Sequence, residues 1–158
     1  MWNIRSLAAG AAVTAAAALL TGFAPAAPPA GDVCRLVDKA QMSRIIGKPV
    51  ALAEAAADDG GPYCNYGVSD DGPFIRVSQL NGDWGQMVGE LSDEAQETVA
   101  DLGAAAVWTP DDYALLVRAR NGKILRVSLD DDDKSLRSGD LKGVAVDIAK
   151  AALKSLGG

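Results

Sequence analysis

The sequence predicts an α+β domain: a curved antiparallel sheet of about five to six strands with helices packed on one face and one disulfide bond. Three observations predict this class. Short apolar runs, typical of strands, are joined by turn residues. Apolar residues at helical spacing occur only in segments before, between and after these runs. The chain also contains two cysteines. The 158 residues suffice for one ordinary domain, which we expect at residues 34–156.

The first residues predict an export signal that precedes this domain. Residues 7–20 are apolar and rich in alanine, which suits the core of a signal peptide and is short for a membrane span. An Ala-Pro-Ala sequence ending at residue 26 supplies the small residues that signal peptidase accepts. We therefore expect a signal peptide at residues 1–26 and a Pro/Ala-rich lead-in at residues 27–33. A retained membrane anchor is the alternative.

Export predicts how the two cysteines are used. In an oxidising compartment Cys34 and Cys64 form an even pair, which indicates a disulfide bond. A metal pair lacks further cysteines and any histidine, and a redox site usually shows a close Cys-x-x-Cys motif. We expect a structural disulfide in a protein that is secreted or held in the periplasm or cell envelope.

The domain is predicted to open with a helix at residues 38–46. Asp38 can accept hydrogen bonds from the first turn, and Gln41 follows at the spacing of a capping box. Gly47 suits the left-handed position after a helix, and Pro49 prevents its continuation.

Two further helices are predicted from apolar residues at helical spacing. The face of the first consists of Trp84, Met87, Val88 and Leu91. The face of the second, at the C-terminus, consists of Leu141, Val144, Ala145, Ile148, Ala152 and Leu156. Ser138 or Asp140 can cap this last helix, and Gly157 ends it. Residues 92–101 either extend the first of these helices or form a loop.

The clearest β-structure is a predicted hairpin at residues 113–129. Strands are also expected at residues 50–57, 63–68, 74–80 and 104–109, separated by Asp-, Gly- and Pro-rich turns. A three-residue hairpin loop at 120–122, with Gly122 left-handed, puts the large apolar residues on one face. These residues are Tyr113, Leu115, Val117, Ala119, Leu125, Val127 and Leu129.

Two segments carry a resemblance to a known group. Cys34 opens a short capped helix that ends in Ile-Gly-Lys-Pro-Val at residues 46–50, and Cys64-Asn65-Tyr66 follows. This pattern resembles uncharacterised exported bacterial domains of actinobacterial type, whose function is unknown. The resemblance covers residues 34–156 and implies an extracytoplasmic α+β domain without implying a reaction.

Charge and residue usage exclude several function classes. Lys and Arg total 15, Asp and Glu total 21, and histidine is absent, so the net charge is −6. The lack of histidine excludes Ser-His-Asp and Cys-His catalysis and histidine-ligated zinc. The acidic balance argues against a nucleic-acid partner. We expect no cofactor and no metal site, and no stable membrane span once the signal is removed.

The strongest candidate for a binding site is a set of arginines. Arg118, Arg120 and Arg126 are expected on the outer face of the hairpin, and Arg76 can join them from the strand at 74–80. Guanidinium groups bind phosphate, sulfate and carboxylate in a bidentate manner. The alternative is a solvated face whose arginines pair with acids on neighbouring strands.

These observations lead to three hypotheses about function. The first is an exported, non-catalytic binding or interaction module whose ligand is an anionic envelope component. The second is a small hydrolase or lyase that uses a pair of carboxylates in place of histidine. The third is a structural partner protein without a ligand.

The acidic run at residues 130–133 lacks the ordered spacing of a calcium-binding loop and suggests at most a weak association with divalent cations.

Overall fold

The fold is described from a computed structural model that places residues 30–91, 95–131 and 135–157. The predicted signal peptide lies outside the described residues. A 3-10 helix, η1 (Ala30–Arg35), includes the end of the segment predicted as a lead-in, and Val33 within it is buried in the core.

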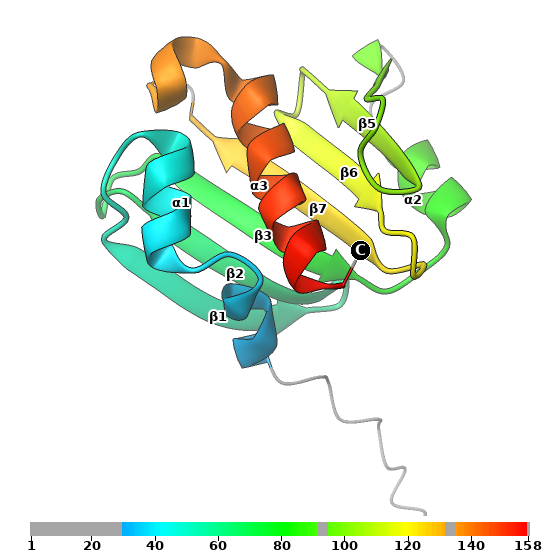
Figure 1. Cartoon of the computed structure of the whole chain (residues 1–158), viewed down its shortest axis with the longest axis horizontal. Helices are drawn as coiled ribbons and strands as arrows, with labels where there is room; N and C mark the ends of the chain where they lie inside the picture. Colours follow the sequence, from blue (N-terminus) through cyan, green and yellow to red (C-terminus); the bar gives the residue numbers. More distant parts are fainter. Residues whose placement is uncertain (1–29, 92–94, 132–134, 158) are drawn as a thin grey trace, which may run out of the picture.

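Within the described residues, seven strands form one antiparallel sheet in the order β1-β2-β3-β7-β6-β5-β4 (Figure 1). The strands are β1 (Leu52–Asp58), β2 (Gly61–Gly67), β3 (Phe74–Leu80), β4 (Glu97–Thr98), β5 (Ala105–Thr109), β6 (Ala114–Arg118) and β7 (Ile124–Asp130). This exceeds the five to six strands predicted from the sequence. The additional strand is β4, whose two residues are too few to show alternation and form a strand only because they pair with β5.

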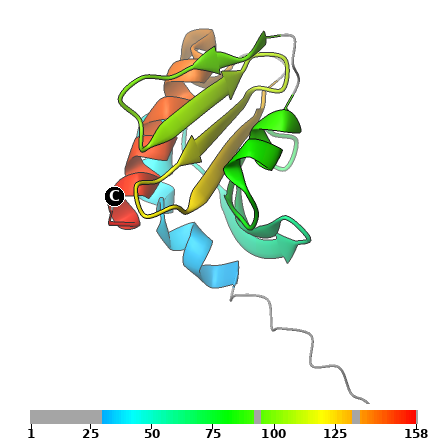
Figure 2. The same cartoon turned by 90° about the vertical axis from the view of Figure 1, so that its right-hand side faces the viewer.

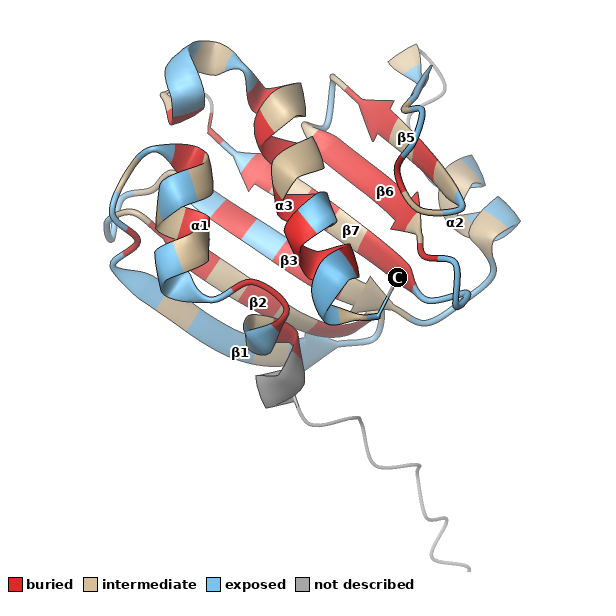
Figure 3. Ribbon diagram, in the orientation of Figure 1, coloured by how far each residue is buried: buried red, intermediate tan, exposed pale blue. Residues whose placement is uncertain are grey.

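The main core lies between the sheet and two helices on one of its faces. These helices are α1 (Lys39–Ile46) and α3 (Leu141–Ser155), and a short 3-10 helix, η3 (Leu136–Gly139), leads into α3. Figure 3 shows buried residues along the central strands and on the sheet-facing side of α3, whereas much of the edge strand β1 is exposed.

The third helix, α2 (Trp84–Gly89), packs on the opposite face of the sheet (Figure 2). Leu116 and Ile124 point to this face because they alternate with core residues of their strands, and they form a small second cluster with Leu91. The expectation that all helices pack on one face is therefore wrong for α2. We call the face opposite α1 and α3 the outer face. The apolar stripe of α2 covers only part of it, around Leu116 and Ile124, with Leu80 of β3 and Val107 of β5 at its margin.

The predicted helix signals act as expected. Asp38 caps α1 by accepting a hydrogen bond of 2.8 Å from the Gln41 N–H, and Gly47 ends the helix with φ of 75°. Of the two predicted caps of α3, Asp140 is used, because its carboxylate accepts the Gly143 N–H at 3.0 Å.

The β6–β7 hairpin has the predicted register. Leu115 lies opposite Val127 and Val117 opposite Leu125, so these four side chains share the core face. Gly122 adopts φ of 85° in the three-residue loop, where a residue with a Cβ atom is strained. The three-residue loop is thus confirmed.

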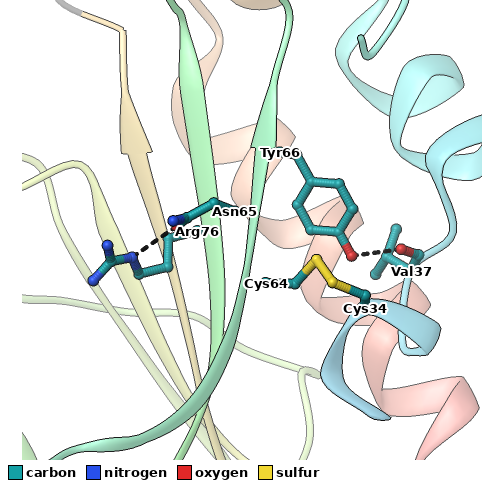
Figure 4. Close-up of a disulfide and its surroundings, with 6 residues drawn as sticks. All are labelled: Cys34, Val37, Cys64, Asn65, Tyr66 and Arg76. Atoms are coloured by element: carbon teal, nitrogen blue, oxygen red, sulfur yellow. Dashed lines mark hydrogen bonds between the residues drawn. A yellow bond between two sulfur atoms is a disulfide. The ribbon is translucent and has the colours of Figure 1, made fainter. Parts of the chain in front are cut away.

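Two links tie the N-terminal segment to β2. Cys34 of η1 and Cys64 of β2 form a disulfide bond with a Cα–Cα distance of 5.0 Å, and the Tyr66 hydroxyl donates a hydrogen bond of 2.6 Å to the Val37 carbonyl (Figure 4). Burial, together with the negative charge of Asp38, raises the pKa of the Tyr66 phenol above its ordinary value of 10.0, so it stays a donor. The segment before α1 is held against the sheet at two adjacent points.

Removing the disulfide should destabilise the fold without changing it. We expect the double substitution Cys34→Ala and Cys64→Ala to lower the free energy of unfolding by about 3–4 kcal/mol, because the bond constrains a long loop in the unfolded chain. Urea denaturation followed by circular dichroism measures this. Reduced wild-type protein is the matched control and should lose a similar amount, whereas a loss below about 1 kcal/mol in both would contradict a stabilising role.

Candidate functional site

Two arginines and two serines form a square on the outer face of the central strands. Arg76 on β3 lies opposite Ser128 on β7, and Ser78 on β3 lies opposite Arg126 on β7. The two arginines are therefore diagonal neighbours, and such positions are about 7–8 Å apart. We call these four residues the Arg–Ser square. Both arginines therefore extend from the same face of the sheet.

The Arg–Ser square forms the floor of a groove of about 1030 Å³, here called the outer groove. All four residues of the square line it, together with Asn65 of β2. The residues around this floor come from the β1–β2 turn, from α2 and the residue after it, from the β5–β6 turn and from the end of β7. The groove remains open because α2 covers the ends of β3 and β7 near Leu80 and Ile124 and leaves the middle of these strands uncovered.

Arg76 is held in place by three neighbours. Its Nε donates a hydrogen bond of 2.9 Å to Asn65 Oδ1, its guanidinium lies 4.1 Å from the centre of the Tyr63 ring, and one terminal nitrogen is 3.7 Å from Asp58. Figure 4 shows Arg76 and Asn65 on one side of the sheet, with Tyr66 and the disulfide on the other. Contacts to the ring and the amide fix the orientation of the guanidinium before any ligand arrives.

Arg126 has no such neighbours. Its Nε is buried and lacks a hydrogen-bond partner, and the side chain forms no ion pair with any of the residues that the structure describes. A buried donor without an acceptor costs about 1–3 kcal/mol, and more when the group is charged. The half-buried Arg126 thus carries a charged donor atom that is buried and unused in the free protein.

The other two predicted arginines lie elsewhere. Arg118 is on the outer face but outside the groove, where its guanidinium lies 5.4 Å from the centre of the Trp84 ring on α2. Arg120 is in the exposed hairpin loop and lines a separate hollow of about 250 Å³ with Lys150 and Lys154 of α3. The structure therefore brings together Arg76 and Arg126 and leaves Arg118 and Arg120 apart from them.

Sequence reasoning missed the two serines and Asn65. Ser78 and Ser128 each stand two residues after an arginine on the same strand, so alternation alone places each serine on the face of its arginine. The sequence therefore contained the signal for each serine, but it did not show that β3 pairs with β7. Between the end of β3 and the start of β7 lie 43 residues, and only the contact of these two strands forms the square.

The hydrolase or lyase hypothesis requires two carboxylates in one cleft. Six line the outer groove: Asp58, Asp59, Glu90, Asp111, Asp112 and Asp130. The carboxylate-pair hypothesis accordingly stays a prediction.

Part of the acidic run has a structural role. Asp131 is 3% exposed, and its carboxylate accepts the Ser135 hydroxyl at 2.9 Å and the Leu136 N–H at 2.7 Å. Burial opposes ionisation, but these hydrogen bonds and the positive charge of Lys48 outweigh it, so the pKa of Asp131 lies below its ordinary value of 3.8. The carboxylate connects β7 to η3. Asp132 and Asp133, also part of the run predicted to associate weakly with divalent cations, lie outside the described residues.

The described residues contain neither a group of side chains that could hold a metal ion nor a helix that could span a membrane. Within residues 30–91, 95–131 and 135–157, no three or more acidic or cysteine side chains are grouped so that they could hold a metal ion. In the same ranges no helix is both long enough and apolar enough to cross a bilayer.

Comparisons with protein-family models, with curated proteins and with solved structures found no match to this chain.

The substitution Asp131→Asn should reduce stability in a pH-dependent way. We expect a loss of about 1–3 kcal/mol at pH 7, because two hydrogen bonds to a charged acceptor are weakened. The folded-state pKa is lowered, so the stabilisation by the ionised form is fully present above about pH 4 and disappears as the pH falls through the folded-state pKa, below 3.8. Urea denaturation at pH 7 and near pH 3 tests this. The exposed neighbour Asp130→Asn is the control, and an equal loss for Asp131→Asn at both pH values would contradict the role of its charge.

Proposed function

We propose that this protein is an exported, non-catalytic binding module that holds an anionic group of its ligand on the Arg–Ser square. The observation that carries the proposal is Arg126, whose buried Nε has no partner although it lies at the floor of an open groove. An anionic oxygen at this position accepts from the unused donor and offsets the cost of its burial.

The other members of the square suit the same ligand. Arg76 stands diagonally to Arg126 and adds a second positive charge to the same face. Its guanidinium is held on the β2 side of its strand, so an anion bridges the two guanidinium groups only when Arg76 turns toward β7. The hydroxyls of Ser78 and Ser128 can donate further hydrogen bonds from the remaining corners. The partial burial of Arg126 strengthens its interaction with an anion relative to that of a fully exposed arginine.

The proposal places the protein outside the cytoplasm, secreted or retained in the cell envelope. Its support is the signal-like sequence at residues 1–26, the disulfide bond and the resemblance of the Cys34–Tyr66 region to uncharacterised exported bacterial domains. An anionic component of the envelope is then the expected source of the ligand.

A hydrolase or lyase that uses two groove carboxylates is the second candidate, favoured by the number of acids that line the groove. An assay for turnover distinguishes this candidate from the binding module. A catalytic protein turns over a glycosidic or related substrate, and this activity is lost on substitution of one groove acid by its amide. A binding module shows saturation without turnover.

The binding proposal predicts a specific loss in arginine variants. Phosphate and succinate, titrated at low salt and followed by amide chemical shifts in NMR, should perturb residues around the Arg–Ser square. We expect Arg126→Gln to weaken this binding by about fivefold or more and Arg76→Gln to weaken it less, because Arg76 is partly engaged by Asp58.

Arg118→Gln and Arg120→Gln are matched controls, because they remove the same charge outside the groove and should change the affinity by less than about twofold. Thermal unfolding of each variant verifies the fold. Unchanged binding in Arg126→Gln, or the absence of shifts around the square, would leave a structural partner protein as the better description.

Export predicts a defined mature terminus. When the gene is expressed in a secreting bacterial host, N-terminal sequencing of the protein from the culture or envelope fraction should begin at Ala27. Mass spectrometry without reductant should show no free thiol. An intact first residue together with two free thiols would contradict the proposed compartment.

A further inference from the structure

The charges around the outer groove differ from those at its floor. Six carboxylates and two guanidinium groups line it, which gives a formal charge of −4. Only one of these acids, Asp58, forms an ion pair with a described residue, at 3.7 Å from Arg76. A simple anion that approaches the Arg–Ser square therefore passes unneutralised carboxylates, which oppose its binding.

The register of the sheet places five of these six acids at the two ends of the groove, and the sixth, Glu90, follows α2. Asp58 ends β1 and Asp59 lies in the β1–β2 turn, which is beside the end of β3, because Asn81 N–H donates to the Gly60 carbonyl at 3.0 Å. Asp130 lies opposite Phe74 at the other end of β3. The β5–β6 turn, with Asp111 and Asp112, belongs to this second end, because β6 begins at Ala114 opposite Ser128.

The second end is lined by acids from two elements, the β5–β6 turn and β7. Three carboxylates, from Asp111, Asp112 and Asp130, line it, and none of them forms an ion pair with the part of the chain that the structure describes. Asp130 follows Ser128 by two residues on β7, a separation of about 7 Å along the strand. The distance from the Arg–Ser square to the nearest acid of this end is thus about the length of an extended chain of four to five carbon atoms.

We infer that the ligand of this groove is amphoteric: it carries a carboxylate or phosphate group for the Arg–Ser square and an ammonium group, about 7 Å or more away, for the acidic end formed by Asp111, Asp112 and Asp130. This inference rests on the proposed binding function and specifies its ligand class. Both charged groups of such a ligand meet the opposite charge, whereas a dianion of the same length brings a second negative charge to the acidic end and a dication brings a positive charge to Arg126.

Three six-carbon probes of matched length separate these cases: aminohexanoate, which is zwitterionic, adipate, which is dianionic, and hexanediamine, which is dicationic. Each is titrated into oxidised protein at low salt and followed by amide chemical shifts. We expect aminohexanoate to bind about two- to fivefold more tightly than adipate, the range that exposed ion pairs give, and hexanediamine to leave the residues of the square unshifted.

Charge-removing variants identify the two ends. Arg126→Gln should weaken both aminohexanoate and adipate. The double variant Asp112→Asn and Asp130→Asn should weaken aminohexanoate by about two- to fivefold while it leaves adipate unchanged or tighter. Glu54→Gln is the matched control, because this exposed acid lies on β1 outside the groove and should affect neither probe.

The outcomes distinguish this inference from the proposal on which it rests. If adipate binds at least as tightly as aminohexanoate and both depend on Arg126, the binding function stands and the amphoteric ligand is overturned. If neither aminohexanoate nor adipate shifts the square in the wild-type protein, the binding function itself fails. Thermal unfolding shows whether a variant with weaker binding is still folded.

Discussion

The pairing of β3 with β7 is the constraint on which both faces of this protein depend. On one face it sets Ile75 opposite Leu129 and Val77 opposite Val127, which are core residues under α1 and α3. On the other face the same register assembles the Arg–Ser square. Because side chains alternate along a strand, a slip of one strand by one residue would turn its core residues outward and bury its arginine. The hydrophobic core therefore fixes the geometry of the candidate site.

The distribution of helices explains why a groove exists on this sheet. Both longer helices, α1 and α3, cover one face, and α2 is only six residues long and covers a part of the other face around Leu116 and Ile124. The disulfide and the Tyr66 hydrogen bond hold the N-terminal segment on the α1 side. The middle of the central strands β3 and β7 is consequently packed on one side and open on the other, and a rigid sheet presents the arginines.

Charge is unevenly distributed over the open face. The chain carries a net charge of −6, and its two groove arginines are surrounded by carboxylates rather than by further cations. Arg76 already shares its charge with Asp58, whereas Arg126 has no ionic partner among the described residues. Under the proposed binding function, this arrangement would disfavour simple polyanions and favour a ligand that carries both a negative and a positive group.

The sequence by itself determined the features that depend on neighbouring residues. The caps of α1 and α3, the left-handed Gly47 and Gly122 and the three-residue hairpin loop are all properties of short segments, and each formed as predicted. The apolar alternation in β6 and β7 likewise selected the face that the core buries. The disulfide followed from there being only two cysteines. Only the tertiary structure decided the order of the strands, the face that α2 covers and the separation of Arg120 from Arg76 and Arg126. These three features depend on contacts between segments that are distant in the sequence, and no local sequence pattern predicts such contacts.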